Sequence, residues 1–339
     1  MIDHVNMDAL SKFFDDIHLN KSEYIYIKAQ GEWAFKTQDQ SALLAYIVLT
    51  GSVYIQLNVS EKITARAGDI ILIPSGKAHH ATDSKATASK LVDPVDITPL
   101  FNGHRHDPIE LGSSTSENTL LLCLRCQVDT YMAGPLINAL PSIMHIQHEN
   151  QATPPEWLQI GLYFLAVETQ KIQPGHDKII DHLVSILLIE CIRDHIQQMS
   201  DQQNWLGALT HPELSNALSA IHSQPEISWT VESLAEQCCM SRSKFANLFN
   251  SIIGEPPLTY LQHYRFRLAS QYLRTSNLSI QQISNKVGYS SVTAFSQAFK
   301  RVFDLSPKQY RQNYIVKLLY YSYKIRKKLE ITHRLSRST

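Results

Sequence analysis

Two stretches of the chain repeat one pattern, VESLAEQCCMSRSKFANLF (Val231–Phe249) and IQQISNKVGYSSVTAFSQAF (Ile280–Phe299). Each predicts two short amphipathic helices joined by a very short turn. Leu234 corresponds to Ile283 at an offset of 49 residues, and the later matching positions are offset by 50. The repeated spacing of apolar residues predicts one helical unit that occurs twice in the chain.

Each unit has the features of a helix-turn-helix. Thr230 and Ser279 are suitable N-caps, because their side-chain oxygens accept hydrogen bonds from free amides of the first helical turn. Gly288 suits an interhelix turn that needs a positive φ, and Cys239 takes its place in the first unit. Two phenylalanines spaced by four residues should anchor each second helix to the core. They are Phe245 and Phe249, and Phe295 and Phe299.

Anchoring one face of each second helix leaves the opposite face outward, and that face is small and polar. Asn and Gln bond adenine edges, while Ser, Thr and Ala suit hydrogen bonds or methyl contacts in the major groove. The outward residues are Arg242, Ser243, Ala246 and Asn247, then Ser291, Val292, Thr293, Ser296 and Gln297. The candidates for phosphate binding are Arg242, Lys244, Ser291, Lys300 and Arg301. Any one of them could be an ordinary solvated position, but the duplicated set predicts a reader of double-stranded DNA.

A spacer separates the two units. Residues 258–276 predict one helix whose apolar face runs from Leu261 to Tyr272. Such a spacer would let two recognition helices enter successive major grooves, roughly 34 Å apart. Arg265 and Arg267 on this helix either assist DNA binding or belong to the surface.

The chain from about residue 211 to 312 resembles the DNA-binding domain of the AraC/XylS family of bacterial transcription regulators. The resemblance lies in WTVESLAEQCCMSRSKFANLFNSIIGEPPLTYLQHYRFRLASQYL and in SIQQISNKVGYSSVTAFSQAFKRVFDLSPKQYR, which is the family's signature region. It implies seven helices, two of them recognition helices, and control of nearby promoters, with RNA polymerase as a further partner. The chain departs from the family at Asp304, where Gly is usual, and at Ser284, where Ala is frequent.

The same resemblance implies which residues read bases. By position in the motif they are Ser243, Ala246, Asn247, Thr293, Ser296 and Gln297. The first set lacks the Arg or Trp that some members use, so the target sequence stays open.

Between residues 24 and 128 the sequence pattern is typical of β-strands. ALLAYIVL and SVYIQL are strand-like runs that meet at residues 50–51, which predicts a hairpin. Turn signals at residues 68–69 and 74–76 separate further strands. Many short strands with regular turns predict a β-barrel or jelly roll.

One motif in this region bears on metal chemistry. GDIILIPSGKAH (Gly68–His79) fits the spacing G-x5-P-x-G-x2-H of the second cupin motif, with His79 as the candidate ligand. A metal-dependent cupin also needs histidines in a first motif, and LLAYIVLTGS holds none. Catalytic metal sites typically use three protein ligands. We therefore predict no metal, no cofactor and no enzymatic activity; the alternative is a metal-dependent cupin enzyme fused to a DNA-binding module.

The region also resembles the cupin-type sensor of one AraC-family subgroup, which implies binding of a small effector or dimerisation. The candidate effector or redox residues are His79, Cys123 and Cys126. The two cysteines lie three apart on a predicted strand, so they should point to opposite faces. These three residues could also form a metal site together with His80, His104 and His106; the alternative is that the histidines are solvated or packed. The effector itself is either an oxidant or another small molecule.

The helical connector is open to two interpretations. EWLQIGLYFLAVETQ and DKIIDHLVSILLIECIRDHIQQM are long periodic segments that either pack against the β-domain or form a dimer surface. The predicted fold class is α+β, with a cupin-like barrel, this connector and an all-α domain with two helix-turn-helix units. The predicted domains are 1–150 (sensor), 151–205 (connector), 206–312 (DNA-binding) and 313–339 (basic tail).

Charge and composition complete the prediction. Residues 1–200 carry a balance of −9, and residues 201–339 carry +9, of which the tail 313–339 supplies +6. The five scattered cysteines form no disulfide framework. With no signal peptide and no apolar run long enough to span a bilayer, we expect a cytoplasmic homodimer with no membrane partner. A DNA-bending architectural protein without a ligand is a third interpretation.

Overall fold

The computed structural model describes residues 8–17, 20–88, 92–101, 107–112, 118–129, 131–147, 156–170, 173–199 and 204–314. The chain divides into two compact units. We call Ile17–Leu206 the β-rich unit, and Met1–Asp16 together with Gly207–Thr339 the helical unit. His104, His106 and most of the basic tail lie outside the described residues. Within the described residues, no helix combines the length and apolarity needed to cross a bilayer.

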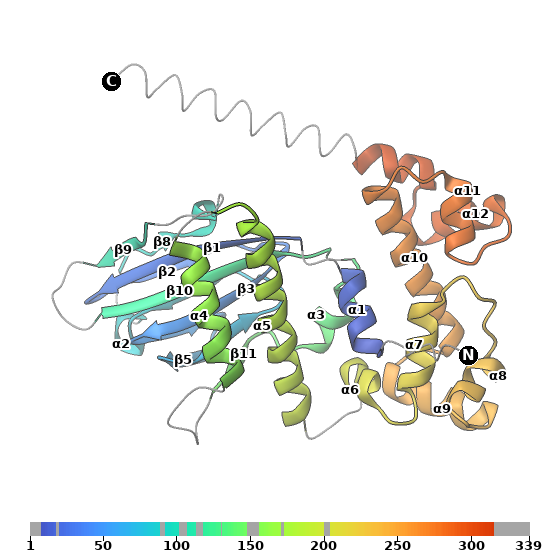
Figure 1. Cartoon of the computed structure of the whole chain (residues 1–339), viewed down its shortest axis with the longest axis horizontal. Helices are drawn as coiled ribbons and strands as arrows, with labels where there is room; N and C mark the ends of the chain where they lie inside the picture. Colours follow the sequence, from blue (N-terminus) through green and yellow to red (C-terminus); the bar gives the residue numbers. More distant parts are fainter. Residues whose placement is uncertain are drawn as a thin grey trace, which may run out of the picture. The chain divides into compact units, whose positions relative to one another are not determined.

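The β-rich unit contains two sheets (Figure 1), as expected for a cupin-like jelly roll. The larger sheet has the strand order β11-β6-β3-β10-β1-β9 and the smaller one β5-β4-β7-β2-β8. The strands are β1 (Asn20–Gln30), β2 (Ala34–Thr37), β3 (Ala42–Thr50), β4 (Ser52–Gln56), β5 (Lys62–Arg66), β6 (Ile70–Ile73), β7 (His79–Thr82), β8 (Val95–Asp96), β9 (Ile109–Gly112), β10 (Asn118–Gln127) and β11 (Met144–Ile146).

The core of this unit lies between the two sheets. Side chains of one strand alternate between the faces of its sheet, so Tyr46 of β3 and Cys123 of β10, which pair in register, both enter the core. Trp33 stacks on Phe35 with ring centroids 5.9 Å apart, and Phe35 lies 5.9 Å from the ring of Tyr46. The barrel interior is therefore filled largely by aromatic and aliphatic side chains.

The predicted hairpin at residues 50–51 is not formed. β3 belongs to the larger sheet and β4 to the smaller one, so the chain crosses between sheets at Gly51. Gly51 has a φ of 75°, and a Cβ there would lie 2.5 Å from Oγ1 of Thr119. The sequence pattern marks where a strand ends, but it does not identify the strand with which the next one pairs.

Helices flank the sheets of the β-rich unit. They are α2 (Lys85–Ala88), a 3-10 helix (Thr98–Leu100), α3 (Gly134–Ala139), α4 (Glu156–Gln170) and α5 (His176–Gln198). α5 lies against β1 with a buried face that includes Ile180, Val184 and Leu188, and Oδ1 of its Asp181 accepts a hydrogen bond from the amide of Ser22 at 2.7 Å. The two helices predicted for the connector are thus present as α4 and α5.

Further helices lie in the helical unit, which α6 enters from the last two residues of the β-rich unit, and residues 307–314 are helical as well. They are α1 (Ala9–Ile17), α6 (Trp205–Thr210), α7 (Ser215–Ser223), α8 (Val231–Gln237), α9 (Arg242–Ile253), α10 (Pro257–Thr275), α11 (Ile280–Lys286) and α12 (Val292–Phe303). α1 comes from the other end of the chain, and the side-chain amide of Gln271 on α10 donates to the backbone oxygen of Asp16 at 2.7 Å. The sequence assigned residues 1–150 to one domain; the structure differs at the start of that range, because the apolar face of α1 packs in the helical unit.

Candidate nucleic-acid interface

Two helix-turn-helix units are present, α8 with α9 and α11 with α12, as the repeat predicts. Both first helices begin at the expected N-cap. The Thr230 hydroxyl accepts from the amide of Ser233, and the Ser279 hydroxyl from the amide of Gln282, each at 3.1 Å. Both caps are reciprocal capping boxes, so each satisfies an otherwise free amide of the first turn.

Left-handed residues occupy equivalent positions in both units. Cys239 (φ 53°) and Gly288 (φ 76°) form the interhelix turns. Gly254 (φ 85°) and Asp304 (φ 57°) end α9 and α12. The left-handed conformation costs a residue with a side chain roughly 1–2 kcal/mol, although Asp tolerates it better than most. Cys239 and Asp304 stand where the other unit has Gly, and both keep the left-handed conformation that the position requires.

The second helices are held to the core by the predicted phenylalanines. Phe245, Phe249, Phe295 and Phe299 are all fully buried. In each pair the ring centroids lie 5.6 Å apart. The anchored face fixes which side of α9 and of α12 remains available to a partner.

The side chains predicted to read bases occur on the opposite side of each helix. Ser243, Asn247, Thr293 and Gln297 are exposed, while Ala246 and Ser296 are half-buried. Within the described part of the chain, no hydrogen bond occupies the side-chain amides of Asn247 and Gln297. Both amides are therefore free to form the two parallel bonds that an adenine edge offers.

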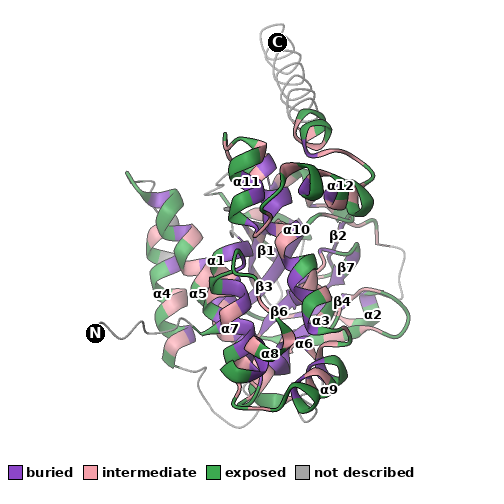
Figure 2. Cartoon of the chain, turned by 90° about the vertical axis from the view of Figure 1, so that its right-hand side faces the viewer, coloured by how far each residue is buried: buried purple, intermediate pink, exposed green. Residues whose placement is uncertain are grey.

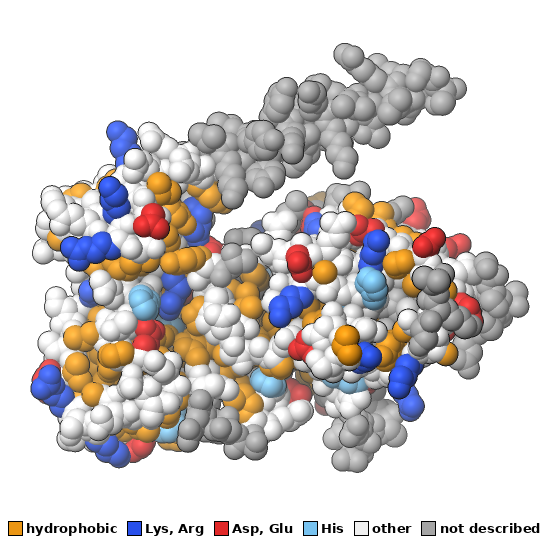
Figure 3. All heavy atoms as spheres, turned by 180° about the vertical axis from the view of Figure 1, so that it is seen from behind, with side chains coloured by type: hydrophobic (Ala, Val, Ile, Leu, Met, Phe, Trp, Pro, Cys, Tyr) orange, Lys and Arg blue, Asp and Glu red, His pale blue; other side chains and the backbone are white. Residues whose placement is uncertain are grey.

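The predicted phosphate-binding cations differ between the units. In the first unit Arg242 Nε lies 2.7 Å from a Glu232 carboxylate oxygen, and Lys244 Nζ lies 2.8 Å from one of Glu213. Lys300 and Arg301 are exposed, and no carboxylate in the described ranges pairs with them. Figure 3 shows Lys and Arg side chains at several separate places on the surface. The hydroxyl of Ser291 caps α12 by accepting from the amide of Ala294 at 3.3 Å, which leaves its O–H free to donate.

The spacer helix α10 joins the two units, and its two arginines have structural partners. Arg265 donates from Nε to the carbonyl of Pro225 at 2.7 Å and from Nη2 to that of Ile227 at 2.8 Å. The guanidinium carbon of Arg267 lies 5.9 Å and 5.8 Å from the ring centroids of Tyr260 and Tyr264. Sequence reasoning could not foresee these contacts, because the pattern does not reveal which backbone carbonyls come near α10.

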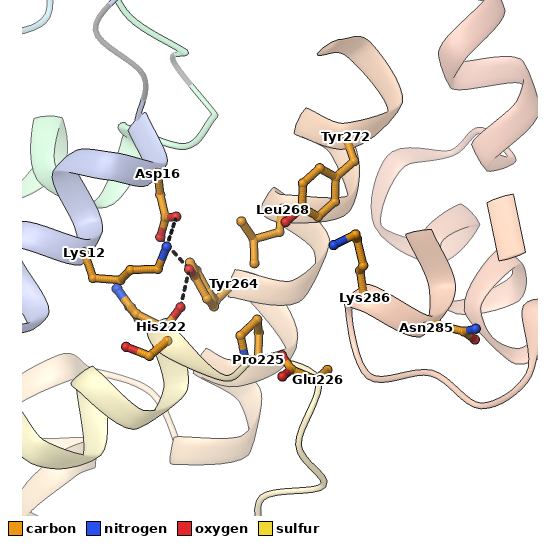
Figure 4. A pocket seen from close by; sticks show the side chains of 11 residues that line it. Lys12, Asp16, His222, Pro225, Glu226, Tyr264, Leu268, Tyr272, Asn285 and Lys286 are labelled. Atoms are coloured by element: carbon orange, nitrogen blue, oxygen red, sulfur yellow. Dashed lines mark hydrogen bonds and ion pairs between the residues drawn. The ribbon is translucent and has the colours of Figure 1, made fainter. Parts of the chain in front are cut away.

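α1 covers part of α7 and α10 beside a cavity of about 440 Å³ (Figure 4). The Tyr264 hydroxyl donates to Asp16 of α1 at 2.5 Å, and Lys12 pairs with the same carboxylate at 3.2 Å. Burial raises the pKa of Asp16, while the bonds from Tyr264 and Lys12 lower it. Across the cavity, the ammonium of Lys286 lies 6.0 Å from the ring centroid of Tyr272. No sequence signal pointed to the contact between Asp16 and Tyr264, because the two residues are 248 positions apart in the chain.

In the β-rich unit, His79 occupies the core rather than an open site. Its Nδ1 lies 2.8 Å from the carbonyl oxygen of Lys77, which only accepts, so Nδ1 carries the proton. Nε2 then accepts a hydrogen bond from the hydroxyl of Tyr46 at 2.7 Å. Burial lowers the pKa of His79 to about 4. The lone pair that a metal would need is therefore taken by Tyr46, which comes from the strand where a metal-dependent cupin has its first motif.

The two cysteines proposed for redox sensing are buried on opposite faces of β10, as their spacing predicts. Cys123 packs in the core, and Cys126 lies 3.6 Å from the hydroxyl of Ser22. Burial raises the pKa of both thiols, that of Cys126 to about 12. A reactive cysteine needs a stabilised thiolate, so these environments disfavour the redox role. In the ranges that the structure describes, no group of three His, Cys, Asp or Glu side chains could hold a metal ion.

The chain matches two known protein families over most of its length. The cupin family pattern matches residues 8–197, and a helix-turn-helix domain pattern matches residues 234–313. The chain is 62% identical to the HTH-type transcriptional regulator AlkR of Acinetobacter baylyi, over 90% of this chain and 99% of that protein. It is 27% identical to the RCS-specific HTH-type transcriptional activator RclR of Escherichia coli, over 80% of this chain and 85% of that one. A Chromobacterium violaceum transcriptional regulator structure with an AraC-type DNA-binding domain is 28% identical, covers 31% of this chain and 94% of its own, and has a TM-score of 0.29.

Proposed function

Because the chain belongs to the AraC-type helix-turn-helix transcription regulators and carries an N-terminal cupin domain, we propose that α9 and α12 read two adjacent major-groove segments of a promoter. The observation that carries this proposal is the matched pair of recognition helices. Each is anchored by two buried phenylalanines, and each presents an exposed amide, Asn247 in one and Gln297 in the other.

The proposed division of labour follows the chemistry of each side chain. Asn247 and Gln297, with their small polar neighbours, contact base edges. Lys300, Arg301 and the Ser291 hydroxyl meet phosphates beside α12. Arg242 and Lys244 do the same beside α9 once DNA replaces Glu232 and Glu213 as their partners. Exchanging an exposed carboxylate for a phosphate costs little, since ion pairs on the surface contribute little to stability.

Asn247→Ala and Gln297→Ala should each relax base preference at one operator position and cost roughly 1–3 kcal/mol there. The measurement is selection of bound duplexes from a random library, followed by titration of single-base variants. Lys300→Ala is the matched control: it should weaken all sequences alike and flatten the dependence of affinity on salt. The placement of the base-reading residues is wrong if both amide variants keep the full base preference of the wild-type chain.

The β-rich unit is proposed as the sensor. An effector that binds one of its states better than another shifts the population of arrangements in which the helical unit binds DNA. The hydrogen bond from Tyr46 to His79 supports a binding rather than a catalytic role, because it occupies the imidazole lone pair. We propose that the protein acts in the cytoplasm as an activator that also contacts RNA polymerase, and that it needs no cofactor.

A second copy of the chain is the proposed partner of α4. Ile160, Tyr163, Phe164 and Val167 follow the spacing i, i+3, i+4, i+7, and all four are exposed although they form an apolar stripe. Tyr163 and Phe164 are 70% and 55% exposed, which leaves on the order of 250 Å² of aromatic surface in water. Figure 2 shows α4 with exposed residues along its length. In a two-fold symmetric dimer the same surface of both copies forms the interface. The uncharged stripe of α4 can therefore pack against the same stripe of a second copy.

Phe164→Asp should convert the dimer to a monomer, because two carboxylates would enter the apolar centre of the interface. Sedimentation velocity on the full chain measures the change, and circular dichroism checks that α4 remains folded. Gln197→Asp on the exposed surface of α5 adds the same charge away from the stripe and should leave the dimer intact. A wild-type chain that sediments as a monomer at tens of micromolar would rule out this interface.

A further inference from the structure

Three segments of the helical unit meet at the side chain of Arg265. The residue projects from the middle of α10 and is partly buried. On one side its guanidinium bonds the carbonyls of Pro225 and Ile227, in the loop between α7 and α8. On the other side it contacts the interhelix turn of the second helix-turn-helix unit at Gly288.

The loop between α7 and α8 transmits this contact to the first helix-turn-helix unit. The carbonyl of Ile227, which accepts from Arg265, also accepts from the amide of Trp229 at 2.8 Å. The indole of Trp229 in turn donates to the carbonyl of Gln224 at 2.9 Å, so the loop is bonded at both ends. Trp229 directly precedes the N-cap Thr230. Arg265 is therefore bonded to the loop that leads directly into α8.

The contact with the second unit depends on the absence of a side chain at residue 288. A Cβ there would lie 2.5 Å from Nη2 of Arg265 and 2.8 Å from the carbonyl oxygen of Glu226. Gly288 thus serves two purposes: it adopts a φ of 76°, and it lets the turn of one unit approach the loop of the other. Phe266, the next residue on α10, packs its ring 6.1 Å from that of Tyr289.

We propose that Arg265 is a positioning residue that sets the spacing and relative orientation of the two recognition helices. The inference rests on the proposed reading of two adjacent groove segments. A planar guanidinium suits this role because its donors form a rigid fork that bonds two carbonyls at once. With Nε and Nη2 both engaged, these donors are not available to a phosphate.

The spacing matters because the two units bind as linked modules. The second binding event is intramolecular, and it contributes fully only when the geometry of the linker matches the spacing of the sites. A change in the spacing of the DNA segments should therefore lower the affinity of the wild-type chain strongly. Without the Arg265 contacts the same change should lower the affinity less, since the two units would then move more independently.

The test uses the full chain and a duplex that the wild-type protein selects from a random library. Four duplexes are compared: the selected site, the same site with 2 bp or 5 bp inserted between its segments, and a site whose second segment is replaced by unrelated sequence. Wild type should lose about 100-fold in affinity on insertion. Arg265→Gln should bind the selected site about 10-fold more weakly and lose less than about 3-fold on insertion. Its affinity for the single-segment duplex should equal that of wild type, which shows that the first unit still reads DNA.

Two further variants separate positioning from charge and from folding. Arg265→Lys keeps the charge but cannot bond both carbonyls as a fork, so it should show the same tolerance of insertion as Arg265→Gln. Lys308→Gln removes an exposed cation elsewhere in the helical unit and should keep the wild-type loss on insertion. Restoration of wild-type behaviour by Arg265→Lys would overturn the inference in favour of simple charge. Equal losses on insertion for Arg265→Gln and wild type would also overturn it, whereas a wild-type chain that selects no duplex would refute the proposed function itself.

Discussion

Replacing Phe295 with alanine should destabilise the helical unit by about 3–5 kcal/mol and lower the affinity for a two-segment operator by about 100-fold or more. Phe295 is fully buried between Tyr289 and Phe299, with both ring centroids 5.6 Å away. The substitution removes apolar contacts and leaves a cavity that the surrounding helices fill only in part. Because Phe295 anchors α12, the second recognition helix loses the support that orients its outward face.

Differential scanning calorimetry of the full chain measures this effect. Two units with separate cores do not unfold in a single two-state transition, so the unfolding of the helical unit has to be followed as a transition of its own. Phe245→Ala is the equivalent change in the first unit and should cost a similar amount, because Phe245 is also fully buried beside Phe249. Val302→Ala is the control: this residue of α12 is exposed, and its loss should cost less than about 0.5 kcal/mol. Equal stability of Phe295→Ala and Val302→Ala would contradict the buried anchor.

The β-rich unit should lose up to about 3 kcal/mol of stability between pH 6.5 and pH 4 through His79 alone. Burial lowers the pKa of this imidazole from its ordinary value of 6.5 to about 4 in the folded chain, whereas the unfolded chain retains the ordinary value. Above pH 6.5 both states are neutral and the group contributes nothing to the pH dependence. As the pH falls through 6.5 toward 4, the unfolded state binds a proton that the folded state does not. Stability must therefore fall with decreasing pH in this window.

Urea denaturation at a series of pH values, monitored in the β-rich unit, measures this slope. His79→Gln removes the titrating group, so its stability should vary less with pH between 6.5 and 4, whatever its stability at pH 7. His80→Gln is the neighbouring control, because His80 is exposed on the same strand. If His79→Gln and His80→Gln showed the same pH dependence as the wild-type chain, the pKa of His79 would not be lowered by its burial.

The duplicated helical unit could be predicted from sequence because its determinants are local. Caps at Thr230 and Ser279, the turn at Gly288 and the anchoring phenylalanines all act within one turn or two of the chain, and the structure confirms each of them. The strands were predicted in the same way from apolar runs and turn signals, whereas the cupin-like class was predicted from the spaced motif at residues 68–79. Local patterns, however, do not specify which segments meet when they are distant along the chain.

The features that sequence reasoning missed are all of this long-range kind. The crossing between sheets at Gly51 passes close to Thr119, and the guanidinium of Arg265 bonds a loop 40 residues away. Tyr46 was visible in LLAYIVLTGS, at the place where a metal-dependent cupin has histidine. Its aromatic hydroxyl, opposite a histidine at the second motif, was the one signal that could have indicated the buried pair in advance.

The packing of α1 has a consequence for the order in which the chain folds during synthesis. α1 leaves the ribosome before the rest of the helical unit, because its partner Tyr264 lies 248 residues later than Asp16. At the usual elongation speed of about 5–20 residues per second, α1 waits on the order of 10–50 s with the apolar side chains of Leu10 and Phe13 uncovered. The intervening β-rich unit has time to fold before the helical unit can close over α1. A fragment that starts at residue 207 would lack this helix, so expressing the helical unit alone calls for supplying residues 8–16 as well.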